Sequence, residues 1–316
     1  MDAVAAVAEH VRQQMSKVIV GQAEMLDQCL ITLLCRGHAL LEGVPGIAKT
    51  LVVKALGAVF QLRFQRVQAT SDLMPADILG TNVLNLATST FSFHAGPVFT
   101  DFLLVDEVNR MPPRTQAALL ECMEERQVTV DGTSHQLPSF FTVFATQNPI
   151  EFEGTYPLPE AQLDRFLLKI NVPYPSAAEE AELLSRVQQG FNSHDLESLG
   201  LQALDSAALT RAQEEIATAV RVEEGLLSYI VQVVRATRES PALSLGASPR
   251  AAVFLMQVAK AQAAIDARDY VIPDDIKSAA LPVLRHRVML KPEAELEGLA
   301  PDQIIQDLLR AIEVPQ

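Results

Sequence analysis

Eight residues, from Gly43 to Thr50, have the types and spacing of a phosphate-binding loop. They follow a short apolar run, residues 39–41, that suits a buried strand. A strand that turns through glycines into a helix points backbone N–H groups at one spot, at the positive end of the helix dipole. There Lys49 would reach the outer phosphates of a nucleotide, and the Thr50 hydroxyl would coordinate Mg²⁺. The sequence therefore predicts a nucleoside triphosphate site formed by Gly43, Val44, Pro45, Gly46, Ile47, Ala48, Lys49, Thr50 and Leu51.

The loop departs from the common pattern at Ala48, where glycine is usual. If this position requires a positive φ, alanine costs on the order of 1 kcal/mol there. An alternative interpretation of the octet is a Gly/Pro turn followed by a chance Lys-Thr pair. The downstream residues help to decide, because a nucleotide site also needs metal-binding and proton-accepting groups.

Two further apolar runs end in polar residues that suit such a site. Residues 101–105 lead into Asp106 and Glu107, and residues 140–146 lead towards Asn148. The carboxyl ends of buried parallel strands open on the ligand crevice of an α/β sheet. We expect Asp106 to hold Mg²⁺, Glu107 to accept the proton of the attacking water, and Asn148 to orient that water. Taken singly, the acidic pair suits a helix start and Asn-Pro suits a turn, but their order and spacing favour the nucleotide site.

The first half of the chain alternates strand and helix patterns, which predicts an α/β fold with a parallel sheet flanked by helices. Helices are expected over residues 1–17 and 113–125, where a proline suits the first turn of the second helix. The alternation stops near residue 176, and helical patterns continue to the end. We therefore expect a nucleotide-binding domain over residues 1–175 and a smaller all-helical domain over residues 176–316. The expected strands lie near residues 38–42, 63–69, 101–105, 140–146 and 166–172.

Two segments of the first domain predict β-hairpins. Residues 81–95 contain two stretches of alternating apolar and polar side chains around a small polar turn, and we expect this hairpin to lie inside a helix. Residues 127–137 predict the second hairpin, because Asp131-Gly132 is a favoured two-residue turn. Whether these hairpins are plain surface ribbons or contact a substrate is left open by the sequence.

The composition argues against several classes of function. The formal net charge is −14, with 39 acidic against 25 basic residues. This charge disfavours binding to nucleic acid or to an anionic membrane and favours protein partners. The N-terminus has no basic region followed by an apolar stretch, and no uncharged apolar run reaches the length of a membrane span. We therefore expect a cytoplasmic protein without membrane insertion.

Cysteine and histidine show no metal-binding pattern in the sequence. Cys29, Cys35 and Cys122 are far apart and form no Cys-x-x-Cys pair, so we expect reduced, buried side chains. The six histidines lack ligand spacing and are expected to be structural or solvated. The basic Arg-His-Arg cluster at residues 285–287 is expected to form a solvated helix face.

Six short segments are distributed along the chain: Val18–Gln22, Gly43–Thr50, Asp106–Arg110, Gln147–Pro149, Leu158–Phe166 and Gly246–Arg250. Together they resemble the MoxR family of AAA+ ATPases. The resemblance implies a P-loop AAA+ sheet in the strand order 5-1-4-3-2, a helical lid, and ATP with Mg²⁺ as cofactors. It makes Ala48 typical, because relatives often share this alanine. It also implies that Ile19, Val20, Gly21 and Gln22 line the adenine pocket.

Two arginines are expected to contact phosphate. Arg250 follows a Ser-Pro pair at a helix start, where the helix dipole disfavours a cation, so an anion should lie near it. Because the lid of this family folds over the nucleotide, the resemblance implies a phosphate as that anion and a sensor role for Arg250. The alternative is an exposed arginine in the first turn. For Arg165 the resemblance implies contact with the γ-phosphate of a neighbouring subunit, and the alternative is a salt bridge with Asp164 or Glu160.

The resemblance implies a homo-oligomer, a hexameric ring by family analogy, that couples ATP hydrolysis to the remodelling or maturation of protein clients. It further implies a von Willebrand factor A domain partner and metal-cofactor insertion. Arg110 and Arg114 are additional candidates for contacts between subunits. A nucleic-acid motor is disfavoured by the acidic balance, and an ATP-gated binding switch is disfavoured by the intact Asp106-Glu107 pair. A subunit of a magnesium-chelatase-type motor is a closely related alternative.

Overall fold

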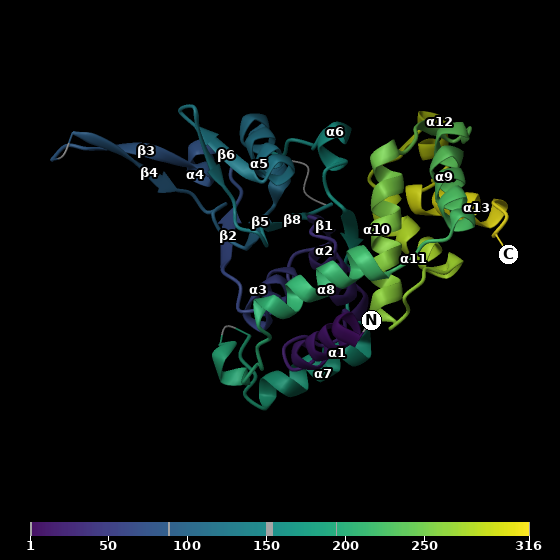
Figure 1. The fold of residues 1–316 in the computed structure, drawn as a ribbon, viewed down its shortest axis with the longest axis horizontal. Coiled ribbons are helices and arrows are strands. Elements are labelled where there is room, and N and C mark those ends of the chain that lie inside the picture. Colours follow the sequence, from purple (N-terminus) through teal and green to yellow (C-terminus); the bar gives the residue numbers. More distant parts are fainter. Residues whose placement is uncertain (1, 88, 150–153, 194, 316) are drawn as a thin grey trace.

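The computed structural model describes residues 2–87, 89–149, 154–193 and 195–315. Its centre is a five-stranded parallel sheet in the order β2-β5-β8-β1-β9 (Figure 1). Counting these five strands along the chain gives 5-1-4-3-2 from one edge to the other, which confirms the expected order. The strands are β1 (Ala39–Glu42), β2 (Phe64–Gln68), β5 (Phe102–Asp106), β8 (Thr142–Gln147) and β9 (Leu168–Asn171).

The central strands are apolar on both sides because helices cover both faces of the sheet. In β5, Phe102 and Leu104 belong to the larger core, which includes residues of α1, α2 and α3. The intervening Leu103 and Val105 belong to the second core, with residues of α4 and α5. This alternation follows from the two-residue period of a strand. The covering helices are α1 (Asp2–Met15), α2 (Ala23–Leu34), α3 (Lys49–Val59), α4 (Pro75–Leu79) and α5 (Pro113–Glu125).

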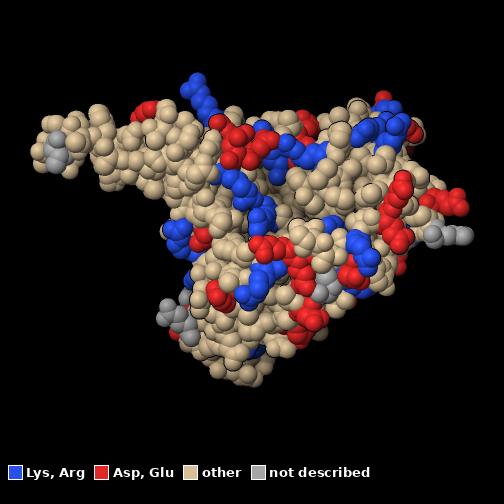
Figure 2. Space-filling view, in the orientation of Figure 1, with Lys and Arg blue, Asp and Glu red and all other residues tan. Residues whose placement is uncertain are grey.

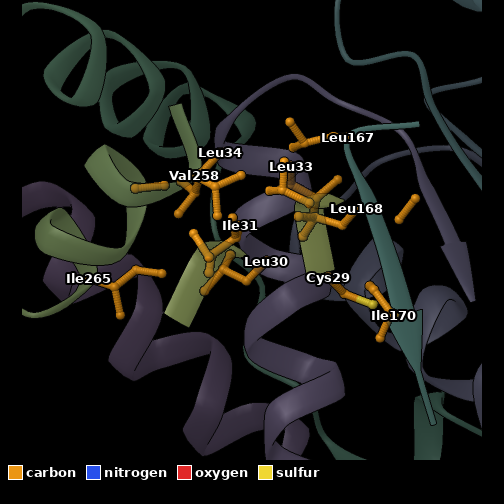
Figure 3. Close-up of a cluster of buried hydrophobic side chains, with 14 of the residues drawn as sticks. Cys29, Leu30, Ile31, Leu33, Leu34, Leu167, Leu168, Ile170, Val258 and Ile265 are labelled. Carbon is orange, nitrogen blue, oxygen red and sulfur yellow. The ribbon is translucent and has the colours of Figure 1, made fainter. Parts of the chain in front are cut away.

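Helix α2 joins the sheet to the C-terminal part of the chain (Figure 3). Its buried side chains include Cys29 and Leu33. They lie in one apolar cluster with Leu168 of β9 and Val258 of α10 (Pro249–Ile265). A helix that is apolar around most of its circumference is stable only when it is covered on more than one side. Helix α2 therefore fixes α10 against the edge of the sheet.

Both expected hairpins are present. The first consists of β3 (Gly80–Asn85) and β4 (Thr90–Ala95), and the second of β6 (Gln127–Val130) and β7 (Thr133–Gln136). The expectation that the first hairpin lies inside a helix is wrong, because it follows the short α4 directly and no helix comes between β4 and β5. Gly80, with φ of 96°, ends α4 and starts the hairpin, and a Cβ there would lie 2.3 Å from the carbonyl oxygen of His94.

The first hairpin extends away from the body of the molecule (Figure 1). Residues 80–95 contain no Asp, Glu, Lys or Arg, and Figure 2 shows its outer part free of charged side chains on the visible face. Phe91 is 71% exposed near the tip. At its base, Phe93 stacks on His135 of the second hairpin, with ring centroids 4.0 Å apart. Asn82 near the same base donates a 2.7 Å hydrogen bond to Asp131 in the turn of the second hairpin. The base of the first hairpin therefore packs on the second hairpin.

The chain after residue 176 is mainly helical, as expected, and several helices begin with proline in the first turn, where no backbone N–H is needed. The sequence reasoning missed a short antiparallel pair, β10 (Leu243–Leu245) and β11 (Met289–Leu290). Helix α8, which follows residue 175, packs on α1, which precedes it. The division into two domains after residue 175 therefore stays a prediction. The remaining helices are α6 (Glu160–Leu163), α7 (Ala177–Gln188), α8 (Ser206–Ala219), α9 (Glu224–Glu239), α11 (Pro273–Leu284), α12 (Pro292–Leu296) and α13 (Pro301–Ala311), with short 3-10 helices at Val108–Arg110 and Glu197–Leu199.

Within the described residues, no helix is both long enough and apolar enough to cross a membrane. The cysteines are free: Cys29 and Cys122 are buried as expected, whereas Cys35 is partly exposed. Burial raises the pKa of all three thiols, that of Cys122 to about 12. These thiols are consequently protonated and unreactive at neutral pH.

Candidate active site

A cavity of about 760 Å³ lies at the edge of the sheet where the parallel strands have their carboxyl ends, here called the carboxyl edge. Three parts of the chain surround it: the loop before α3, the segment before α2, and helix α7. The lining residues include Ile19, Val20, Gln22, Pro45, Gly46, Ile47, Ala48, Lys49, Thr50, Leu51, Asp106, Glu107 and Thr146. The structure thus brings most of the predicted binding residues around one cavity. Gly43 and Val44 lie at the start of the loop, outside this lining.

The backbone of the loop depends on particular residues. Ala48, immediately before α3, has φ of 64°, so the position with the unusual alanine does require a left-handed conformation. Gly46 has φ of 83°, and the space next to its Cα is open. At Gly43 a Cβ would lie 2.7 Å from the carbonyl oxygen of Val172, so a larger residue would collide with the chain after β9. Glycine is required at Gly43 for close approach and at Gly46 for its φ angle.

Lys49 begins α3 and folds back over the loop, where its ammonium group donates a hydrogen bond to the carbonyl oxygen of Gly43. Burial lowers the pKa of Lys49, while the negative charges of Asp106, Glu107 and Glu42 act in the opposite direction. The lysine is therefore a cation held among carboxylates at the mouth of the loop.

Asp106 ends β5 and is held from two sides. Thr146 of β8 donates a hydrogen bond from its hydroxyl to Asp106 Oδ1 over 3.1 Å, and Arg66 of β2 forms a 2.6 Å ion pair with Asp106 Oδ2. The same Thr146 oxygen accepts a hydrogen bond from the Glu107 backbone N–H at 2.9 Å. The sequence reasoning missed both Thr146 and Arg66. Thr146 could have been found from its position at the end of the apolar run over residues 140–146.

Glu107 adopts a left-handed backbone conformation, with φ of 58° and ψ of 50°. This conformation is uncommon for a residue with a side chain and is typical of functional sites. Gln68 donates a hydrogen bond to Glu107 Oε2 over 3.1 Å, and Arg110 lies 3.0 Å from the same oxygen. Arg110, expected as a candidate for the subunit interface, therefore holds the side chain of Glu107. Asn148 is buried directly after β8, at the same edge of the sheet.

The apolar wall of the cavity comes from a helix that the sequence reasoning did not connect with the site. Leu183, Leu184 and Val187 of α7 line the cavity, although each is more than 40% exposed. The segment before α2 also lines the cavity and contacts α7. Gly21 has φ of 67°, a left-handed conformation that favours glycine, and the Glu179 side chain of α7 lies against it. This wall suits the flat, apolar face of a nucleotide base.

Arg165 and Arg250 do not line this cavity. They line a separate hollow of about 290 Å³ together with His38 and Leu167, which come directly before β1 and β9. Since the strands are parallel, this hollow lies at the amino edge of the sheet, roughly a strand length or about 15 Å from the carboxyl edge. In this structure neither arginine reaches the nucleotide cavity of its own chain.

Arg250 forms an ion pair with the carboxylate of Glu124, at 2.6 Å. Arg165 forms an ion pair with the same carboxylate, also at 2.6 Å. The suggested partners of Arg165, Asp164 and Glu160, are therefore wrong. Asp164 instead pairs with Arg287 of the C-terminal part, with 2.7 Å between Arg287 Nε and Asp164 Oδ1.

The expectation of a solvated face at residues 285–287 is wrong. His286 and Arg287 are 6% and 5% exposed. Arg287 donates hydrogen bonds to Asp164 and to the carbonyl oxygens of Phe166 and Leu167, and it stacks over the ring of Phe254 at 4.9 Å. Burial lowers the pKa of Arg287 to about 10, so the side chain stays charged at neutral pH. The cluster therefore joins the chain before β9 to the C-terminal helices.

The residues around the large cavity fit a nucleoside triphosphate with Mg²⁺. Asp106 and Thr50 offer carboxylate and hydroxyl oxygens, which are the ligands that Mg²⁺ prefers. Lys49 and the open backbone at Gly46 suit phosphate, and the α7 wall suits the base. Within the described residues, no group of three or more His, Cys, Asp or Glu side chains forms another metal site.

Comparison with known proteins gives the same result for the class of protein. Residues 38–168 match the ATPase family associated with various cellular activities (AAA), and residues 235–308 match the AAA lid domain. The chain is 45% identical over 303 residues to the uncharacterised protein YeaC of Bacillus subtilis, covering 96% of this chain and 93% of that protein. It is 44% identical over 312 residues to Chaperone MoxR1 of Mycobacterium tuberculosis, covering 96% and 81%.

Among solved structures, that of a candidate ATPase from Cytophaga hutchinsonii has a TM-score of 0.89 and 42% sequence identity, covering 100% of this chain and 98% of that one. The fold and the site thus define an AAA+ ATPase with a helical lid. The chain belongs to the MoxR family of these ATPases.

Proposed function

We propose that the protein hydrolyses ATP to ADP and phosphate, with Glu107 as the general base. The observation that carries this proposal is the placement of Lys49, Asp106 and Glu107 around one cavity with an apolar wall. Such a cavity can hold a nucleotide by its phosphates and its base while presenting a carboxylate to a water molecule.

Each of these residues has its own task. Lys49 binds the outer phosphates as a point charge, and Asp106 and Thr50 hold Mg²⁺. The bound ion would neutralise charge on the phosphate oxygens. Glu107 accepts the proton of the attacking water at a carboxylate oxygen while Arg110 keeps that carboxylate in place. Asn148 is proposed to orient the water.

We also propose that the chain works in the cytoplasm as a homo-oligomer, a hexameric ring by family analogy. The position of Arg165 at the amino edge supports this proposal, because the arginine can reach a nucleotide only in another subunit. Arg250 shares the carboxylate of Glu124 with it and is proposed to reach the same neighbouring nucleotide. Arg114 is exposed near the start of α5 and stays a candidate for the interface.

The proposed substrates are protein clients that the ring remodels or matures, with metal-cofactor insertion as one form of maturation. The word chaperone in the name of MoxR1 supports this class of client, and the net charge of −14 argues against nucleic acid. We also propose a von Willebrand factor A domain protein as a partner. Capture of partners with a hydrolysis-deficient, ATP-bound variant tests both assignments. Stimulation of hydrolysis by DNA would favour the alternative of a nucleic-acid motor.

Replacing Lys49 with alanine is expected to weaken ATP binding by at least about tenfold, because a charge-assisted contact with the phosphates is lost. Isothermal titration calorimetry of the purified subunit measures this change. Lys54→Ala, at an exposed position of the same helix, is the matched control and should bind ATP normally. Equal affinities of the two variants would contradict the role of the loop.

Replacing Arg250 with alanine is expected to lower the turnover of the assembled protein while leaving the nucleotide-free subunit almost as stable. The reason is that its ion pair with Glu124 is partly exposed and contributes at most about 1 kcal/mol. Steady-state ATPase assays and thermal unfolding provide the two measurements, with Arg235→Ala on α9 as control. A large loss of stability with unchanged turnover would make Arg250 a structural residue.

A further inference from the structure

Glu124 occupies a special position near the C-terminal end of α5. Its Oε2 atom lies 2.6 Å from Arg165 Nε, and its Oε1 atom lies 2.6 Å from Arg250 Nη2. Each oxygen of one carboxylate therefore accepts a hydrogen bond from a different guanidinium group. The two arginines come from separate parts of the chain, the turn after α6 and the first turn of α10.

The surroundings of Glu124 are strongly basic. The hollow at the amino edge is lined by Arg36, Arg126, Arg165 and Arg250, and Glu124 is the acidic residue among its described lining residues. Two guanidinium groups this close to each other repel unless a negative charge lies between them. The hydrogen bonds from Arg165 and Arg250 lower the pKa of Glu124, so the carboxylate is ionised at neutral pH.

A second carboxylate fixes the backbone on which these arginines lie. Asp164 accepts hydrogen bonds from Arg287 Nε at 2.7 Å and from the Ser248 hydroxyl at 3.0 Å. Ser248 comes two residues before Arg250, and Asp164 comes directly before Arg165. The two chain segments are thus tied together through Asp164. Arg165 Nη1 also donates a 3.3 Å hydrogen bond to the carbonyl oxygen of Ala161. Glu124 is the contact that the two partly exposed arginine side chains share.

We propose that Glu124 is a positioning residue that holds Arg165 and Arg250 as a pair directed at one point. The spacing of two carboxylate oxygens resembles that of two oxygens on a phosphate, so the paired guanidinium groups are already arranged for a phosphate of the neighbouring subunit. This inference rests on the proposed ATP hydrolysis between subunits. Glu124 itself touches no nucleotide in this arrangement, because it acts through the two arginines.

The pairing can be tested without any nucleotide by labelling arginines with phenylglyoxal and mapping the products by mass spectrometry. In Glu124→Gln, phenylglyoxal should label Arg165 and Arg250 about tenfold faster than in the chain with Glu124, because each arginine loses its charged partner. The rate for Arg221, which pairs with Asp269 elsewhere, should not change and is the internal reference. Unchanged rates for both arginines, or a change at only one of them, would overturn the proposal.

The consequence for activity is tested by steady-state kinetics of the assembled protein. Glu124→Gln should lower kcat about tenfold with an unchanged KM for ATP, because the nucleotide cavity lies at the other edge of the sheet. Glu124→Asp keeps the charge and should restore part of kcat, while Glu125→Gln, the exposed neighbour, is the matched control. Light scattering verifies that the variants assemble equally.

The outcomes separate this inference from the proposed function. Absence of ATP hydrolysis in the unmodified protein, under conditions where it assembles, would contradict the proposed function itself. Hydrolysis in the unmodified protein with an equal or higher kcat in Glu124→Gln would overturn the positioning role alone. A loss of thermal stability that Glu124→Asp does not reverse, with proportionate losses in kcat and in assembly, would also overturn it, because Glu124 would then be a purely structural residue.

Discussion

Replacing Glu107 with glutamine is expected to leave ATP binding nearly unchanged and to lower hydrolysis by about 10² to 10⁴. Glutamine keeps the size of the side chain but cannot accept a proton from water. The lost ion pair with Arg110 is partly exposed, so the folded state should lose at most about 1 kcal/mol. Calorimetry gives the affinity for ATP, and a phosphate-release assay gives the rate.

Glu121→Gln is the matched control for this experiment, because Glu121 is an exposed carboxylate on the following helix α5. It should hydrolyse ATP at the normal rate. Near-normal turnover in Glu107→Gln would remove Glu107 from the mechanism. Loss of ATP binding in that variant would instead indicate that the carboxylate has a role in shaping the cavity.

Replacing Arg165 with alanine is expected to leave ATP binding intact and to lower hydrolysis by up to about 10³. An arginine that stabilises the charge of the transition state contributes to the rate and hardly to the affinity of the ground state. Because Arg165 lies away from the cavity of its own chain, we expect the loss to arise between subunits. The ATPase rate of the assembled variant measures the effect.

Mixing two inactive variants distinguishes action between subunits from action within one. Lys49→Ala subunits have a defective loop but an intact Arg165, so beside an Arg165→Ala subunit they should complete that subunit's site and restore hydrolysis. Light scattering must first show that the subunits exchange. If activity then stays at the sum of the two inactive parents, the shared-site mechanism is wrong.

The sheet and the nucleotide cavity were largely predictable because their signals are local. The loop from Gly43 to Thr50 and the acids after β5 are short motifs, and the apolar runs have the length of buried strands. Turn chemistry predicted the second hairpin, where Asp131 and Gly132 both have positive φ. The pair β10 and β11 was missed because two or three residues carry no clear strand pattern.

The arrangement at the amino edge was not predictable, because its contacts join residues far apart in sequence. Glu124 is separated from Arg165 by 41 residues and from Arg250 by 126. Arg287 was predicted to be exposed to solvent. Its burial depends on Asp164 and on carbonyl groups before β9, and these partners are more than 100 residues away in the sequence. The α7 wall was missed for a similar reason, since its exposed apolar residues pack on no core of their own.

Helix α5 connects the two edges of the sheet. It starts a few residues after Glu107 and ends beside the arginine pair, and its 13 residues span about 20 Å. In the proposed assembly, each subunit carries one incomplete site at the carboxyl edge and one donor group at the amino edge. In an open row of such subunits, the number of complete sites is one fewer than the number of subunits, whereas closure into a ring completes them all. Activity per subunit should thus rise with protein concentration and level off once the rings have closed.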